Sequence, residues 1–182
     1  IHRGVFLSRN MLGRFLKPPP DAVTPDPPEL HPGLTTRERV TLQTSAEQCR
    51  ACHGMINNLG FALEDFDAAG RYRTEDVGRP VDSSGSYATR QGDAVEFRGV
   101  DELATFLAGS PEAHEAFVAQ MFRQLTKQPI QAFGPDRLTE RRIRFAETGY
   151  SIRTLLVELT AESALWMREL GKDTQTAAVN PQ

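Results

Sequence analysis

The sequence predicts a mainly α-helical protein with a small β-hairpin near the middle and further helices towards the C-terminus. Apolar residues recur at helical spacing near the N-terminus and again over residues 100–169. Between them, residues 72–99 hold glycines and alternating residues that suit a hairpin. The 182-residue chain is 39% hydrophobic and 25% charged, which is an ordinary globular composition. This length suits one domain, or one domain with a small appendage.

The first helix is expected in residues 2–16, where five apolar residues fall near helical spacing: Val5, Phe6, Leu12, Phe15 and Leu16. The proline-rich segment 17–33 ends this helix, because proline lacks the backbone N–H, and is expected to form an extended strap. A second helix begins at Thr35, which stands in capping-box spacing to Glu38, and is expected to end at Gly54.

Residues 57–73 are predicted to form a turn, a short helix and a second turn, followed by the hairpin. The expected strand centres are Tyr87, Val95 and Phe97. We therefore assign residues 1–78 to a first region with the N-terminal helix and strap. Residues 79–170 form a second region with the hairpin and the later helices.

Helices dominate the sequence from Val100 onward. One begins at Ser110, because Ser-Pro-Glu is a favourable helix start. Its apolar stripe consists of Phe117, Met121 and Leu125. Two more helices are expected near 136–147 and 151–169, and the polar, unpatterned segment 171–182 is expected to be a loose tail.

The charge pattern argues against two kinds of partner. The formal net charge is -3 and the pI about 5.8, with lysine and arginine scattered, so neither nucleic acid nor an anionic membrane surface is favoured. The longest apolar runs, such as the one near Leu155, are far too short to span a membrane. Because the chain begins IHRGVF without an initiator methionine, we expect it to be a piece of a longer protein.

The segment QCRACHGM, residues 48–55, contains both cysteines of the chain and a histidine directly after the second one. Two thiols separated by two residues can add across the two vinyl groups of haem, and the adjoining histidine can then bind the iron. The porphyrin sets this spacing. Cys49, Cys52 and His53 are therefore candidate ligands of one covalently attached haem c.

Other interpretations of the motif stay open. A zinc site would need a fourth ligand from the three remaining histidines, without paired spacing. A thioredoxin-like dithiol would stand at the start of a helix after a buried strand, whereas Cys49 to His53 are expected on the last turn of a helix. A disulfide would close a very small loop and add little stability, and the pentapeptide can also arise by chance.

The chain resembles the planctomycete-type cytochrome c domains over nearly all of its length up to about Leu170. The similarity is carried by HRGVFLSRNMLGRFLKPPPDAVTPDPPELHPGLTTRERV, CRACHGMINNLGFALEDFDAAGRYR, VDSSGSYATRQGDAVEFRGVDELATFLAGS and AFVAQMFRQLTKQPIQAFG. The resemblance implies a cytochrome c-like helical domain in which residues 1–78 attach the haem and residues 79–170 complete its pocket. It makes Cys49 and Cys52 the haem attachments and His53 the proximal iron ligand.

This chain departs from the family pattern at Asn57-Asn58, where an acidic residue and proline are usual. The proline that could orient the proximal imidazole is therefore missing, but the backbone carbonyl of Asn58 can still accept a hydrogen bond from the ring N–H of His53.

The candidates for the sixth iron ligand are His114 and Met121. They lie seven residues apart and therefore on one face of the helix that begins at Ser110. Met121 also suits core filling and His114 a surface position in the first turn, while the resemblance slightly favours His114. His2 and His31 are weaker candidates, and a five-coordinate iron with an open distal side is a further alternative.

Further haem contacts are expected from residues that follow the motif. Leu59 and Phe61 are candidates for an apolar wall beside the haem, although both also suit an ordinary core. Arg71 and Tyr72 are candidates for binding the haem propionates, although both also suit a solvated strand edge.

These predictions favour an electron-transfer haem protein rather than an enzyme, as a module of a larger protein. Its partner would be a redox protein or other domains of the same chain. The alternatives are a peroxidase-like haem enzyme with an open distal site, and a structural or interaction module of a surface protein. Because c-type haem is attached outside the cytoplasm, we expect a periplasmic or cell-surface location.

Overall fold

The computed structural model describes residues 1–16 and 31–179, with side chains through Trp166. It confirms the mainly helical class with a small hairpin, since the described residues form seven α-helices and two small antiparallel sheets. The chain divides into two compact units, residues 1–113 and 114–182, and each is described by itself. The proline-rich strap lies mostly outside the described residues.

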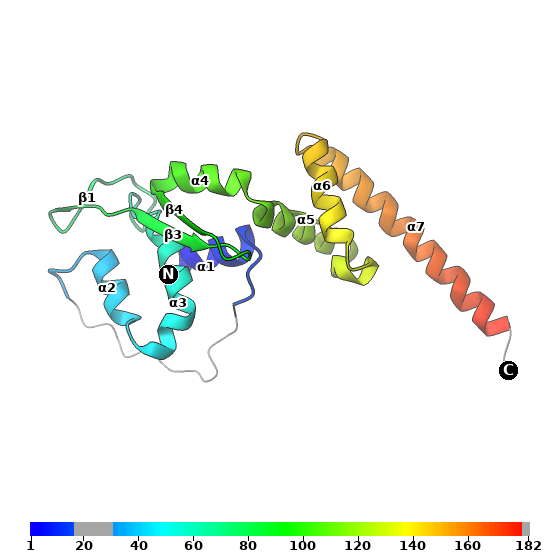
Figure 1. Ribbon diagram of the computed structural model, residues 1–182, viewed down its shortest axis with the longest axis horizontal. Coiled ribbons are helices and arrows are strands. Elements are labelled where there is room, and N and C mark those ends of the chain that lie inside the picture. Colours follow the sequence, from blue (N-terminus) through cyan, green and yellow to red (C-terminus); the bar gives the residue numbers. More distant parts are fainter. Residues whose placement is uncertain (17–30, 180–182) are drawn as a thin grey trace. The chain divides into compact units, whose positions relative to one another are not determined.

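The first unit contains most of the elements (Figure 1). Its helices are α1 (His2–Phe6), continued by a π-helical turn (Leu7–Met11), α2 (Thr36–Gln43), α3 (Glu47–Phe61) and α4 (Gly99–Gly109). Its strands are β1 (Glu75–Asp76), β2 (Arg79–Pro80), β3 (Ser84–Ala88) and β4 (Ala94–Arg98), which pair as β1–β2 and β3–β4.

Two helices replace the single helix that was expected from Thr35 to Gly54. The capping box is confirmed. The Thr35 side chain accepts a hydrogen bond from the backbone N–H of Glu38, and the Glu38 carboxylate accepts one from the backbone N–H of Thr35. However, α2 ends before Thr44, whose backbone is no longer helical, although both its N–H and its hydroxyl donate to the Val40 carbonyl. Gly54 does not end α3, because burial of the following residues, which include Ile56 and Leu59, outweighs the helix penalty of glycine.

Helix α3 is held between α1 and β3 at two close backbone approaches. A Cβ atom on Gly4 would lie 1.8 Å from the Ile56 carbonyl oxygen, and one on Gly85 would lie 2.4 Å from the Asn58 carbonyl oxygen. Residues two positions apart on a helix lie about 200° apart around its axis, so the two glycines approach nearly opposite sides of α3. Any side chain at Gly4 or Gly85 would therefore push a neighbour away.

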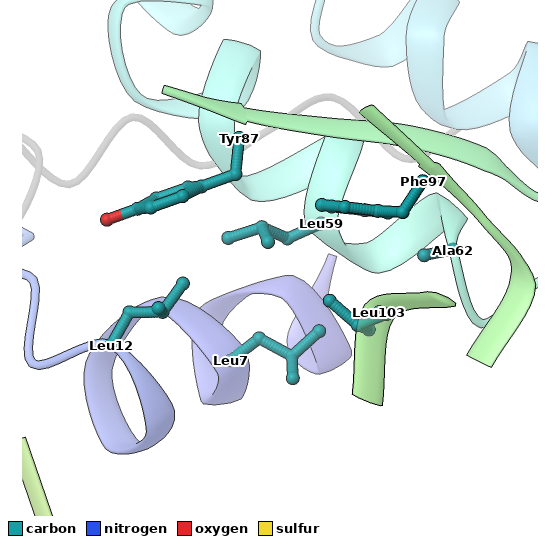
Figure 2. Packing of buried hydrophobic residues seen from close by; sticks show 7 residues of the cluster. All are labelled: Leu7, Leu12, Leu59, Ala62, Tyr87, Phe97 and Leu103. Carbon is teal, nitrogen blue, oxygen red and sulfur yellow. The ribbon is translucent and has the colours of Figure 1, made fainter. Parts of the chain in front are cut away.

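The core of the first unit joins these same elements (Figure 2). It consists of Leu7, Leu12, Leu59, Ala62, Tyr87, Phe97 and Leu103. Tyr87 and Phe97 point from the hairpin towards α3, in the register that pairs Tyr87 with Val95 and Gly85 with Phe97. The Tyr87 hydroxyl donates to the Glu112 carboxylate over 2.6 Å, so its polar end is paired at the edge of the core. Burial, followed by the nearby Glu112 carboxylate, raises the pKa of Tyr87.

The second unit is built from α5 (Pro111–Thr126), whose first turn belongs to the first unit, a 3₁₀ turn (Ile130–Phe133), α6 (Arg137–Glu147) and α7 (Ile152–Val179). Its core contains Val118, Phe122, Ile130, Phe133, Phe145, Leu155 and Leu159. Arginines of α6 pair with glutamates of α7, as in Arg144–Glu158 at 3.0 Å and Arg141–Glu162 at 3.2 Å.

Two boundaries in the structure bear on the predicted regions. The first compact unit continues to Ala113, because the β3–β4 hairpin packs on α3, and the division into haem regions 1–78 and 79–170 stays a prediction. Helix α7 continues to Val179, through most of the segment 171–182 that was expected to be a loose tail. No glycine or proline interrupts residues 172–179, so local sequence does not stop the helix.

We predict that Gly4→Ala lowers the free energy of unfolding by about 1–3 kcal/mol, because the added methyl group overlaps the Ile56 carbonyl. Gly85→Ala should cost a similar amount through the Asn58 carbonyl. Urea unfolding followed by far-UV circular dichroism measures both changes. Gly109→Ala is the control, since a Cβ atom there meets nothing within 4 Å. Equal losses in all three variants would contradict the role of close packing.

Candidate functional site

The C-x-x-C-H motif occupies the first two turns of α3 rather than the last turn of a helix. Cys49, Cys52 and His53 stand at positions i, i+3 and i+4, so their side chains emerge on one face of the helix. Each is partly exposed, and both cysteines are free thiols. This face therefore presents two thiols and one imidazole together.

His53 is held by a side chain of its own helix. Its Nδ1 atom lies 3.2 Å from Oδ1 of Asn57, one turn further along α3. The amide nitrogen of Asn57 donates to the Thr44 hydroxyl over 2.8 Å, and that hydroxyl donates to the Val40 carbonyl over 2.7 Å. Asn57 and Thr44 are both buried.

The acceptor beside His53 differs from the one that the sequence offered. The Asn57 side chain rather than the Asn58 carbonyl takes this role, while the Asn58 carbonyl faces Gly85. The i, i+4 spacing of His53 and Asn57 is the sequence signal that could have identified this pair. Nothing in the sequence indicated Thr44, because it directly follows another helix.

Helix α2, which Thr44 directly follows, is held in place by charged groups. The Arg79 guanidinium donates to Glu38 over 2.5 Å, and Asp76 accepts from the backbone N–H of Thr36 over 2.6 Å. The hydrogen bond from Arg79 and then that from the Thr35 N–H lower the pKa of Glu38 to about 2. The β1–β2 segment thus anchors the start of α2.

The two residues predicted to form an apolar wall beside the haem are both buried. Leu59 belongs to the core of the first unit, and the Phe61 ring lies under the Arg37 guanidinium at 4.3 Å. Both lie on the same helix as the motif. Their contact with haem stays a prediction.

The predicted propionate-binding residues lie on the surface. Arg71 forms an ion pair of 2.8 Å with Asp67, and its side chain is 82% exposed. The Tyr72 ring meets the Phe66 ring edge-to-face and is 69% exposed. Neither is buried, so both are accessible to a ligand, and their role in binding stays a prediction.

The nearby Arg73 instead has an internal role. It pairs with Glu64 over 2.6 Å and with Asp76 over 3.1 Å, and its side chain is only 20% exposed. Burial raises the pKa of Glu64, against the opposing effect of the Arg73 charge. Arg73 therefore offsets the cost of burying a carboxylate.

Arg3 ties α1 to the chain that follows α3. Its Nη1 donates to the carbonyls of Leu63 and Phe66 over 2.6 and 2.7 Å, and its Nη2 donates to the carbonyl of Asp67. Two of these carbonyls also accept a backbone N–H, that of Leu63 from Phe66 and that of Asp67 from Gly70, so the guanidinium adds a second hydrogen bond at each of them.

Two hollows of about 570 and 490 Å³ open on the first unit. The larger lies beside α2, and half of its lining residues are charged, while the smaller lies beside the hairpin. Cys49, Cys52 and His53 do not line either one. The motif is therefore on an open helix face outside both hollows.

The two candidate distal ligands belong to the second unit. The His114 ring lies 4.7 Å from the Tyr150 ring, and Met121 packs against the second core. The proximal candidate His53 belongs to the first unit. Distal ligation by either residue stays a prediction.

Two further findings concern the described part of the chain. Within it, no three or more His, Cys, Asp or Glu side chains gather closely enough to hold a metal ion. None of its helices has the length and apolar character that crossing a membrane requires.

Residues 1–76 match the family model described as PSCyt3, a protein of unknown function (DUF1588). The matched range includes α1, α2, α3 and residues 49–53, and the family name points to a planctomycete-type domain associated with cytochrome c. No curated protein and no solved structure matches the chain.

We predict that Arg73→Ala lowers the free energy of unfolding by about 1–3 kcal/mol, because Glu64 is left largely buried without its partner. Arg71→Ala is the matched control: its exposed ion pair should contribute less than about 1 kcal/mol. Chemical denaturation measures both. If Arg71→Ala cost as much as Arg73→Ala, the internal role of Arg73 would be disproved.

We also predict an acid-sensitive anchor for α2. Because the pKa of Glu38 falls from 4.5 to about 2 on folding, its stabilising effect is complete above about pH 4.5 and is lost as the pH falls towards 2. Arg79→Ala should return the Glu38 pKa towards 4.5, and an NMR titration of the Glu38 carboxyl measures this shift. Arg71→Ala, which removes a distant charge pair, should leave this pKa unchanged.

Proposed function

We propose that this chain is a c-type haem module in which Cys49 and Cys52 hold the porphyrin and His53 binds the iron. The observation that carries the proposal is the presentation of two free thiols and one oriented imidazole on a single helix face. The PSCyt3 match over residues 1–76 supports it, because it includes this motif.

The attachment chemistry needs only groups that this face provides together with the porphyrin. Each thiol adds across one vinyl group: the sulfur bonds one vinyl carbon, and the thiol hydrogen passes to the other carbon. No external oxidant or reductant enters this balance. Because both thiols are partly exposed, they are accessible from the same side as the imidazole.

When bound, the haem would supply one-electron redox chemistry, and the protein would supply ligation and a fixed orientation. Helix α3 suits this task, because its second half is locked into the core at Leu59 and by the close approaches to Gly4 and Gly85. The exposed face leaves one side of the site open to a redox partner. We therefore propose electron transfer to a partner protein or to other domains of a longer chain.

The remaining haem contacts are part of the same proposal. His114 or Met121 would complete the iron coordination, and Arg71 and Tyr72 would pair with the propionates. The location would be periplasmic or at the cell surface, because c-type haem is attached outside the cytoplasm.

Covalent attachment is tested on the full chain produced in a host with cytochrome c maturation. We expect a reduced pyridine haemochrome spectrum of the c type and an intact mass increased by one haem. Cys49→Ser and Cys52→Ser should each retain at most one thioether bond, and the double variant should carry no covalent haem. Ser45→Ala, a change just before α3, is the control and should retain full attachment. Colourless matured protein with two free thiols would disprove the proposal.

Electron transfer is distinguished from enzyme chemistry by the coordination of the iron. We expect six-coordinate, low-spin iron that binds cyanide slowly. His114→Ala and Met121→Ala identify the distal ligand, since only the variant that removes it should become high-spin. High-spin wild-type iron that binds peroxide or cyanide rapidly would favour a peroxidase-like enzyme instead.

A further inference from the structure

A series of hydrogen bonds runs from His53 through Asn57 and Thr44 to the Val40 carbonyl, which can only accept a hydrogen bond. Thr44 donates its hydroxyl hydrogen to the Val40 carbonyl, and a carbonyl oxygen has no hydrogen to return. The Thr44 oxygen therefore faces Asn57 with a lone pair. This fixes the direction of every bond between the Val40 carbonyl and the histidine ring.

The Asn57 amide extends this fixed order of donors and acceptors to His53. Because the Thr44 oxygen accepts, the NH₂ group of Asn57 must face it, at 2.8 Å. The opposite end of the amide, Oδ1, then faces His53 and is itself only an acceptor. The Nδ1 atom of His53 must therefore carry a hydrogen, which leaves the lone pair of the neutral ring on Nε2.

We infer that Asn57 and Thr44 are positioning residues that hold His53 in the Nδ1–H tautomer with Nε2 free to bind iron. The role in binding iron rests on the proposed function, whereas the tautomer follows from the hydrogen bonds alone. Partners of this kind fix the orientation of a ligating imidazole and raise its basicity. Helix α2 thereby contributes to the site, although it carries none of the three motif residues.

Burial makes this arrangement hard to replace. Asn57 and Thr44 are 8% and 7% exposed, so water has little access to substitute for either partner. A flipped Asn57 amide would set its oxygen against the Thr44 oxygen, whose hydrogen is already donated to the Val40 carbonyl. The buried amide therefore holds one orientation.

The tautomer is tested first on the full chain produced without haem. Long-range ¹H–¹⁵N NMR spectra at about pH 8, above the ordinary imidazole pKa of about 6.5, report which ring nitrogen carries the hydrogen. We expect the Nδ1–H form in the wild type and a shift towards the Nε2–H form in Asn57→Leu. Asn58→Ala changes the neighbouring residue and should leave the tautomer unchanged.

A second pair of variants keeps the test informative should Asn57→Leu fold poorly. Asn57→Asp retains an acceptor at the same place and should keep the Nδ1–H form. Thr44→Val removes the oxygen that orients the amide and should weaken this preference without touching His53. The inference would be overturned if His53 of the wild-type protein were in the Nε2–H form. It would also be overturned if both Asn57→Leu and Thr44→Val kept the wild-type tautomer, whether or not haem is bound.

The role towards iron is tested by the midpoint potential of the haem-loaded chain. Loss of a hydrogen-bond partner of a metal-binding histidine typically weakens metal binding by about tenfold or more. If Asn57→Leu weakens the binding of His53 to oxidised iron tenfold relative to reduced iron, the one-electron midpoint potential rises by 59 mV. We expect a rise of about this size in Asn57→Leu, a fall in Asn57→Asp and no change in Asn58→Ala. Equal potentials in all four proteins would overturn the positioning role towards iron. A locked tautomer in a protein that never binds haem would instead disprove the proposed function alone.

Discussion

The close packing of three backbones at Gly4, α3 and Gly85 is the constraint on which the rest of the first unit depends. It places α3 within reach of both α1 and the hairpin, so that Leu59 can meet core side chains from both. Side chains of ordinary size at the two glycines would separate these elements and open the core. The second half of α3 is therefore rigid, and the first half, which carries the motif, extends from that rigid base into a more exposed region.

Charged residues in the segment after α3 serve mainly to hold the site in place. Arg73 compensates the buried Glu64, and Arg79 anchors the start of α2 through Glu38. This anchoring matters for the motif because Thr44, the residue that orients Asn57, directly follows the end of α2. The support of His53 thus extends from its own helix to α2 and from there to the β1–β2 segment. Arg71, in contrast, is largely exposed and has a single weak structural partner.

The match to the PSCyt3 family ends at residue 76, whereas the first compact unit continues to Ala113. The matched part contains the motif, Asn57 and Thr44, and it ends within the segment that anchors α2. The β3–β4 hairpin, which completes the core around α3, lies outside the match. The proposed haem chemistry is thus carried by the matched part, while part of the packing that holds α3 comes from the chain that follows it.

The sequence alone determined features that depend on local chemistry. The helical class, the capping box at Thr35, the hairpin with Tyr87 and Phe97 at its centre, and the C-x-x-C-H spacing all follow from short-range patterns, since turns, caps and periodicity act over a few residues. Tertiary structure decided that Gly54 is internal to α3, because packing outweighs the propensity of one residue. It also decided that the Asn57 side chain, oriented by Thr44, holds His53. That arrangement depends on the position of the end of α2 next to α3, and no local sequence pattern encodes where the Thr44 hydroxyl will lie relative to Asn57.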